Sequence, residues 1–518
     1  MFNIPELDCM ISRLLNQSDL ACAAQVLSKW NSGLGAYVWT AIPAFTMNSR
    51  QHISLYMLVV EDYVYEKRKE EAVKEEPCGS GSQCPASQRR DPPALTKYGG
   101  RVSRILCPSS LLLALSTPPS NTTTTTMTTT TTTTTATSHA PSGEDLFLHI
   151  LKKCPSISKL SMSDACYRSD EVLHLMTPIF SKIKELNVSY NHQTRELATT
   201  SRLRKMMSLL PELEKLGINI GKLMAGGDFE EEICAKPKVL EVALEQNHVL
   251  ADLRAIKWLW PCCSDLHELR IRQIPTNVFQ SMSGAMGKIT KLESLALGNM
   301  EESKSLPGFT DRQVASIIRA HRSLQSVALG QIANVGVLTT EVLSEMDGSL
   351  QDLTICQADA RAKLTSILAS CQLRSFDTVR DRTSANIAFP TINAKDMIDH
   401  QDDGTLREWK SEPSLQMLSI RIGSIGQAVD PHAPIATAAC QKNVMYQIEI
   451  CSRLARFTSL AVLRLGHISS ANPRIARHNQ QTGCLQLTLL TGLRQLETLT
   501  NLIEFNVSEM RHAIGVAE

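Results

Sequence analysis

The chain has 518 residues, too many for one ordinary hydrophobic core, so several domains or an array of repeats are expected. Its 53 lysines and arginines nearly balance its 52 aspartates and glutamates, which gives no general attraction to nucleic acid or to an anionic membrane. Fifteen scattered cysteines and the lack of a signal peptide indicate a reducing compartment, the cytoplasm or the nucleus. The longest apolar runs are far shorter than a membrane span, so no membrane association is expected.

The first segment, residues 4–42, has the pattern of three short helices. Pro5 suits the first turn of a helix, and Ser18 suits the cap of the second. The apolar residues that follow Pro5 at helical spacing are Leu7, Met10, Ile11 and Leu14. Three such helices cannot bury all of their apolar surface among themselves, so a partner helix or groove is expected.

The order of residues in this segment resembles the F-box. The matching positions are Ile4-Pro5, Ile11-Ser12, Asp19-Leu20, Val26 with Trp30, and Val38-Trp39. The family binds the Skp-type adaptor of Skp–cullin–F-box ubiquitin ligases and, through it, a cullin. The resemblance implies that adaptor contacts are made by Pro5, Ile11, Leu20, Val26 and Trp30. The alternative is a small helical cap on the domain that follows.

The segment after the predicted F-box changes character twice. Residues 48–77 carry mixed charges and indicate a helical or charged connector. Residues 78–143 are rich in Thr, Ser, Pro and Gly, and positions 122–135 are all Thr except Met127. Such a composition lacks the apolar periodicity needed for a core, so a disordered linker is predicted.

From Leu146 onward, a short unit recurs in the order apolar, two variable, apolar, one variable, apolar. A regular spacing held over eight units indicates a repeat architecture, in which each unit buries its apolar face by stacking on its neighbours. The first eight central positions, 26 to 32 residues apart, are Leu160, Leu186, Leu216, Val242, Leu269, Leu295, Val327 and Leu353. Later copies centre on Phe376, Leu418, Leu463 and Phe505.

Each unit has the pattern of one short strand followed by a returning helix. Thr310 and Gln313 have the spacing of a capping box, and Val314, Ile317 and Ile318 then share one helix face. The segment from Arg380 to Pro413 is predicted to form a surface loop. The units resemble leucine-rich repeats. The expected fold is therefore α/β: a three-helix F-box at 1–47, then a curved leucine-rich-repeat solenoid at 144–518 with one strand and one helix per repeat.

No nucleotide-binding loop or hydrolase motif is present. Cys262 and Cys263 with His267 could suggest a thiol nucleophile or a metal site, but adjacent cysteines in a strand point apart. A buried or incidental cysteine pair is the preferred interpretation. We expect no catalytic residue, no metal and no cofactor.

The two resemblances together imply the substrate-recognition subunit of a ubiquitin ligase, with a protein target and no nucleic-acid or membrane partner. The alternatives are a repeat scaffold without ligase coupling and an enzyme hidden in the loops. Residues beside the inward apolar positions of each strand must point outward and form the target-binding face. The charged candidates are Glu241, Glu245, Glu268, Arg270, Arg272, Arg421 and Arg464.

Overall fold

The computed structural model divides into two compact units. The first unit comprises residues 1–237 with 250–255, and the second comprises residues 238–249 with 256–518. The structure describes most of residues 151–163, 177–220, 233–244, 258–273, 286–298, 309–378, 390–423, 438–466 and 485–507, together with 41–42, 104–106, 148–149 and 223–224. The predicted adaptor contacts from Pro5 to Trp30, and Glu245, lie outside the described residues.

The first unit contains a parallel sheet in the order β1-β2-β3-β4-β6. Its three longer strands are β3 (Lys159–Ser163), β4 (Glu185–Ser189) and β6 (Lys215–Ile220), and α9 (Thr200–Ser208) precedes β6. The predicted central positions Leu160, Leu186 and Leu216 are paired across these strands and are all buried. A separate parallel pair joins β5 (Ala198–Thr199) to β7 (Leu223–Met224).

The first two strands of this sheet were not predicted. β1 (Ala41–Ile42) lies within the segment assigned to the F-box, and β2 (Arg104–Leu106) lies within the segment assigned to the linker. β1 pairs with β2, and β2 pairs with β3 in the register that sets Ile105 beside Leu160. The linker prediction contained no strand, so its description as disordered throughout needs correction at Arg104–Leu106.

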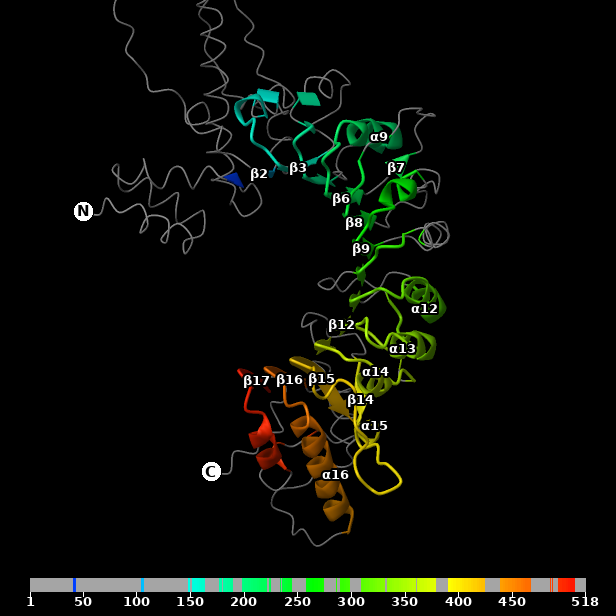
Figure 1. Cartoon of the computed structure of the whole chain (residues 1–518), viewed down its shortest axis with the longest axis vertical. Helices are drawn as coiled ribbons and strands as arrows, with labels where there is room; N and C mark the ends of the chain where they lie inside the picture. The colour runs from blue at the N-terminus through cyan, green and yellow to red at the C-terminus, as the bar shows by residue number, and fades with distance from the viewer. Residues whose placement is uncertain are drawn as a thin grey trace, which may run out of the picture. The chain divides into compact units, whose positions relative to one another are not determined.

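The second unit has the same architecture, with nine parallel strands in chain order (Figure 1). A tenth described strand, β14 (Ile392–Asn393), pairs with the end of β15. The nine are β8 (Val239–Leu244), β9 (Glu268–Gln273), β10 (Ser294–Leu297), β11 (Ser326–Leu329), β12 (Asp352–Ile355), β13 (Ser375–Asp377), β15 (Met417–Gly423), β16 (Val462–Gly466) and β17 (Glu504–Asn506).

The strand register follows the predicted repeat closely. From Leu269 in β9 to Phe505 in β17, each predicted central residue is paired with the next one along the chain. In β10, β11 and β12, buried and half-buried side chains alternate, as expected for strands with one face in the core. The parallel α/β repeat is therefore confirmed, and it is compatible with a solenoid.

One register prediction is wrong by two residues. In β8, Leu240 rather than Val242 is paired with Leu269, so Glu241 lies beside Arg270 rather than beside Glu268. A slip of two residues keeps every side chain on its original face, because side chains alternate with a period of two. Glu241 therefore still points outward, and its neighbour on β9 is Arg270, the next outward residue after Glu268.

The described helices between the strands lie along one side of the sheet. In the second unit, α12 (Asp311–Ala320), α13 (Val337–Ser344) and α14 (Leu364–Ser370) lie side by side there (Figure 1). The predicted capping box of α12 is present, since Thr310 accepts from the Gln313 amide and the Gln313 side chain binds back to Thr310. Such a box satisfies amide groups that the first turn leaves open.

The segment from Arg380 to Pro413 is not simply a surface loop where the structure describes it. β14 and α15 (Ala394–Met397) lie within it, and Ile392, Met397 and Trp409 are buried. The cause is Arg453 of α16 (Ala438–Ala455), whose fully buried guanidinium lies 2.6 Å from a Glu412 carboxylate oxygen. The same guanidinium donates to the Met397 carbonyl oxygen at 3.1 Å and stacks over the Trp409 ring at 4.4 Å.

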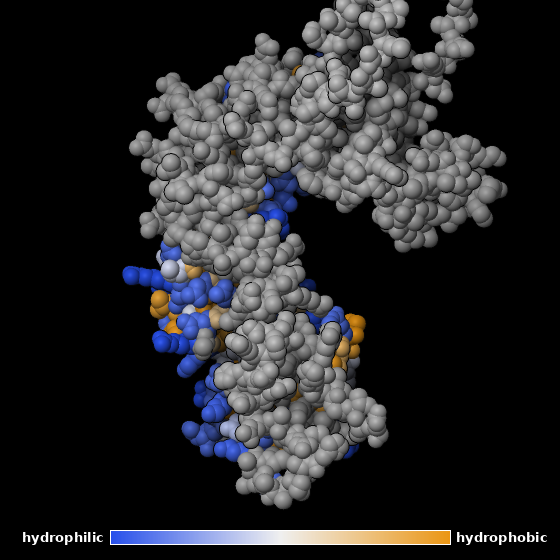
Figure 2. Space-filling view, turned by 180° about the vertical axis from the view of Figure 1, so that it is seen from behind, coloured by the Kyte–Doolittle hydropathy of each residue, from blue (hydrophilic) through white to orange (hydrophobic). Residues whose placement is uncertain are grey.

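Among the described residues, no helix is both long enough and apolar enough to cross a bilayer. Most of the described residues visible from behind are hydrophilic, and the apolar ones that reach this surface form small separate patches (Figure 2).

Candidate protein-binding faces

The outward side of the strands carries a polar face in each unit. A parallel strand that packs one row of side chains into the core must present the alternate row on the other side of the sheet. Because neighbouring strands are in register, residues at equivalent positions of successive repeats become neighbours about 4.8 Å apart. The predicted target-binding residues that the structure describes in the second unit lie on this side, and Arg421 is the one among them that is buried.

The charged end of the second unit's face is built by β8 and β9. Arg272 lies with its guanidinium 2.5 Å from a Glu241 carboxylate oxygen. Arg270 forms an ion pair with Glu268, two residues earlier on the same strand. The structure therefore brings four of the predicted residues together as two ion pairs. Both arginines are exposed, whereas the two glutamates are half-buried.

Small side chains occupy the next two strands of the same face. Ser294 is paired with Ser326, and Ala296 with Ala328, in the register of β10 and β11. The four side chains are half-buried. The following strand, β12, places Asp352 beside Ser326 and Thr354 beside Ala328.

The far end of this face differs from the prediction. Arg464 of β16 is held by Glu504 of β17 through two hydrogen bonds of 2.8 and 3.1 Å. Arg421 was expected to extend the exposed face, but only 3% of its surface is accessible. Asp377 and Ser419, at outward positions of β13 and β15, are buried as well. Strand β15 is thus buried on both sides, and Arg421 is removed from the set of contact residues.

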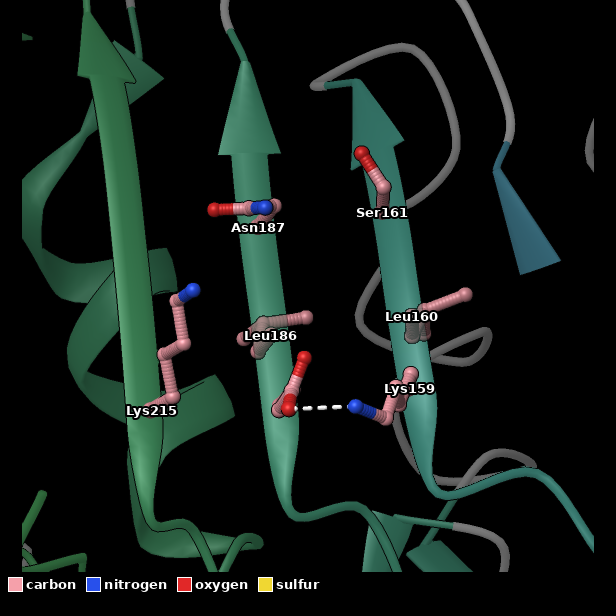
Figure 3. Close-up of a pocket in the computed structure, with 7 residues that line it drawn as sticks. Lys159, Leu160, Ser161, Leu186, Asn187 and Lys215 are labelled. Carbon is pink, nitrogen blue, oxygen red and sulfur yellow. Dashed lines mark hydrogen bonds and ion pairs between the residues drawn. The ribbon is translucent and has the colours of Figure 1, made fainter. Parts of the chain in front are cut away.

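The first unit carries a second polar face, which the sequence analysis did not single out. A shallow hollow is lined there by Lys159, Leu160, Ser161, Glu185, Leu186, Asn187 and Lys215 (Figure 3). The Lys159 ammonium group lies 2.6 Å from a Glu185 carboxylate oxygen. The alternation of side chains that places Glu241 outward also places the polar lining residues outward, since they flank the buried Leu160, Leu186 and Leu216.

The cysteine pair considered as a nucleophile lies in a 3-10 helix, η3 (Trp260–Cys263), and not in a strand. Cys263 is buried, and its thiol donates to the Leu259 carbonyl oxygen at 3.3 Å. Burial, with a smaller effect of the neighbouring Cys262, raises the pKa of the Cys263 thiol far above its usual range. A thiol held in the neutral form is a poor nucleophile and a poor metal ligand.

No family model matches the chain, and no curated protein matches it. The crystal structure of a Bacteroides fragilis protein, determined as a structural-genomics target, is similar with a TM-score of 0.31 and 13% sequence identity. The similar region covers 46% of this chain and 70% of that one. A likeness of this size gives no information about activity or partners.

Proposed function

We propose that the chain is the substrate-recognition subunit of a Skp–cullin–F-box ubiquitin ligase. The proposal rests on the order of F-box-like residues in 4–42, followed by a parallel α/β repeat with polar strand faces. Its single strongest support is the pair of polar faces, because extended repeat surfaces commonly bind other proteins. The place of action would be the cytoplasm or the nucleus.

In this proposal the two ends of the chain have separate tasks. Pro5, Ile11, Leu20, Val26 and Trp30 bury apolar surface against the Skp-type adaptor, and the adaptor links the chain to a cullin. The strand faces hold a target protein beside the ubiquitin-loaded enzyme. Ubiquitin transfer is then accelerated by proximity and orientation, without a catalytic group from this chain.

Adaptor capture by charged variants tests the first task. Leu20→Glu or Val26→Glu would leave a charge desolvated at the adaptor interface, at a cost of several kcal/mol. We expect capture of the purified Skp-type adaptor to be lost in both variants, while the circular dichroism and melting of the repeats stay unchanged. Unchanged capture by both variants would refute the adaptor assignment.

A repeat scaffold without ligase coupling is the second candidate, and one observation favours it. Ala41–Ile42, inside the segment assigned to the F-box, forms β1 and pairs with β2 as another parallel strand. In this alternative the N-terminal segment caps the repeats instead of binding an adaptor. Deletion of residues 1–40 separates the two candidates: a ligase subunit loses only the adaptor, whereas a capped scaffold loses stability in the repeats.

A further inference from the structure

A row of charged residues crosses the sheet of the first unit at one register level. Arg104, Lys159, Glu185 and Lys215 occupy equivalent positions on β2, β3, β4 and β6. Three of these four neighbouring positions are cationic, and one is acidic. The row therefore carries an excess of positive charge that the nearly neutral chain as a whole does not.

The positive charge in this row is only partly neutralised. Glu185 accepts a hydrogen bond from Lys159, as the dashed line in Figure 3 shows. Within the described part of the chain, Lys215 has neither an ion pair nor a side-chain hydrogen bond. Its side chain is half-buried and extends toward the level of Asn187 (Figure 3). Lys215 is therefore positioned at the hollow with its charge uncompensated.

Neutral donors stand next to these cations. Ser161 and Asn187 occupy the next outward row and line the same hollow. The neighbouring position on β6 is Gly217, and a Cβ there would lie 1.5 Å from the Asn187 side-chain oxygen. The absence of a side chain at 217 thus lets the Asn187 amide lie across β6, close to Lys215.

We propose that this face docks an acidic segment of a partner protein, with the side-chain carboxylates of that segment bound around Lys215, Asn187 and Lys159. This inference rests on the proposed function, since it names the kind of segment that one of the strand faces holds. Charge complementarity selects the occupant: carboxylates meet an uncompensated ammonium group and neutral amide and hydroxyl donors. The partner's charge then steers association as well as binding.

The cations that line the hollow favour carboxylates over phosphate groups. Tight phosphate recognition commonly uses the planar fork of arginine, whereas the two cations of the hollow, Lys159 and Lys215, are lysines. A phosphorylated residue carries close to two negative charges, so its attraction to the lysines and its repulsion by Glu185 both rise about twofold, and the charges alone do not select it.

Fluorescence anisotropy on the purified full-length chain tests the proposal. The probe is a labelled peptide of six Glu-Ser repeats in about 50 mM salt, where exposed charges are weakly screened. We expect saturable binding that weakens as salt is added. Lys215→Glu should weaken it about tenfold, because an attraction becomes a repulsion. Lys152→Glu is the matched control, since Lys152 is exposed and precedes β3, and it should change affinity less than twofold.

Glu185→Gln gives a result that a merely structural role would not give. It removes the repulsion and releases Lys159, so it should strengthen binding about threefold. Absence of binding, or equal affinity of the Lys215→Glu and native chains, overturns the proposal, as does weaker binding by Glu185→Gln. Preference for a phosphoserine peptide of equal charge, or for an oligothymidylate of equal charge, overturns the choice of occupant.

The outcome is separable from that of the adaptor test. Peptide binding is measured without adaptor, and adaptor capture is measured without peptide. If adaptor capture is observed but peptide binding is not, only the acidic segment is rejected. If peptide binding is observed but adaptor capture is not, the ligase assignment is rejected and this face remains the docking surface of a scaffold.

Discussion

Asp311 connects two neighbouring repeats, and its removal should loosen the second of them. The residue starts α12, but its carboxylate accepts hydrogen bonds from the start of α13. The donors are the amides of Gly336 at 2.8 Å, Leu338 at 3.0 Å and Thr339 at 2.9 Å, and the Thr339 hydroxyl at 2.6 Å. Gly336, the residue before α13, has no capping side chain of its own, and Asp311 takes that role from the preceding repeat.

The expected cost of Asp311→Ala follows from these contacts. Loss of a helix cap alone costs about 0.5–2 kcal/mol, and hydrogen bonds to a charged group contribute more than neutral ones. We expect a local loss of about 2 kcal/mol, which corresponds to about 30-fold faster hydrogen exchange. The amides of Gly336, Leu338 and Thr339 should show the change, because they donate to the missing carboxylate. Asp396→Ala, an exposed aspartate in the first turn of α15, is the control.

The pH dependence of the same contact gives an independent check. Partial burial raises the pKa of Asp311, but the hydrogen bonds from the Thr339 hydroxyl and from the Thr339, Gly336 and Leu338 amides outweigh it and lower the pKa below its usual range. A lowered pKa means that the carboxylate stabilises the fold above about pH 4 and that this contribution is lost as the pH falls through the folded value. Asp311→Asn should therefore be less stable than the native chain at pH 7 and nearly equal to it near pH 2. Normal exchange at α13 in Asp311→Ala at pH 7 would refute this reasoning.

Two further changes test other parts of the second unit. Arg453→Met should lower the free energy of unfolding by about 3 kcal/mol and speed hydrogen exchange across 394–413, because it removes the main donor to buried carbonyl groups and to Glu412. Arg494→Met is the control, since Arg494 forms an exposed pair with Glu497, and it should change the urea midpoint little. Burial lowers the pKa of His321, and a hydrogen bond with the Ile289 backbone opposes this effect more weakly. The folded chain should therefore lose stability as the pH falls below about 6.5, because the unfolded chain binds the proton more readily. His321→Gln should flatten that part of the plot of urea midpoint against pH. An unchanged profile in His321→Gln would show that His321 protonates freely in the folded chain.

The repeat pattern could be predicted from the sequence because it depends on local chemistry. One apolar spacing, apolar at positions one, four and six of each unit, places three side chains in the core and sets the register between neighbouring strands. The predicted register of β8 was wrong because this local spacing occurs there twice. Pro237, Leu240 and Val242 satisfy that spacing as well as Val239, Val242 and Leu244 do, and only burial against neighbours decides between them. The strand at Arg104–Leu106 was missed although Val102, Ile105 and Cys107 repeat the spacing, because the composition around it indicated a linker.

Contacts between distant residues could not be predicted in this way. Asp311 reaches an amide 25 residues away, and Arg453 binds a carboxylate 41 residues away, so neither partner is marked by local spacing. Arg421 follows the outward rule perfectly and is still buried, because a strand can be covered on its second side by other parts of the chain. The rule predicts on which face a side chain lies, but it does not predict whether that face is open.

Ion pairs within each face limit the free energy that its charges can contribute to the binding of a partner. A charged partner must replace an existing ion pair with a new one at Arg272–Glu241 and at Arg464–Glu504, so the net gain in binding free energy is small. The double variant Arg272→Gln with Glu241→Gln should therefore leave target capture within about threefold of the native value. Reversal of Arg270 and Arg272 to glutamate should instead weaken the capture of an acidic target strongly, because it gathers four carboxylates on β8 and β9. If the neutral double variant abolishes capture, the two partners bind the target directly, and the second unit rather than the hollow around Lys215 is the main contact.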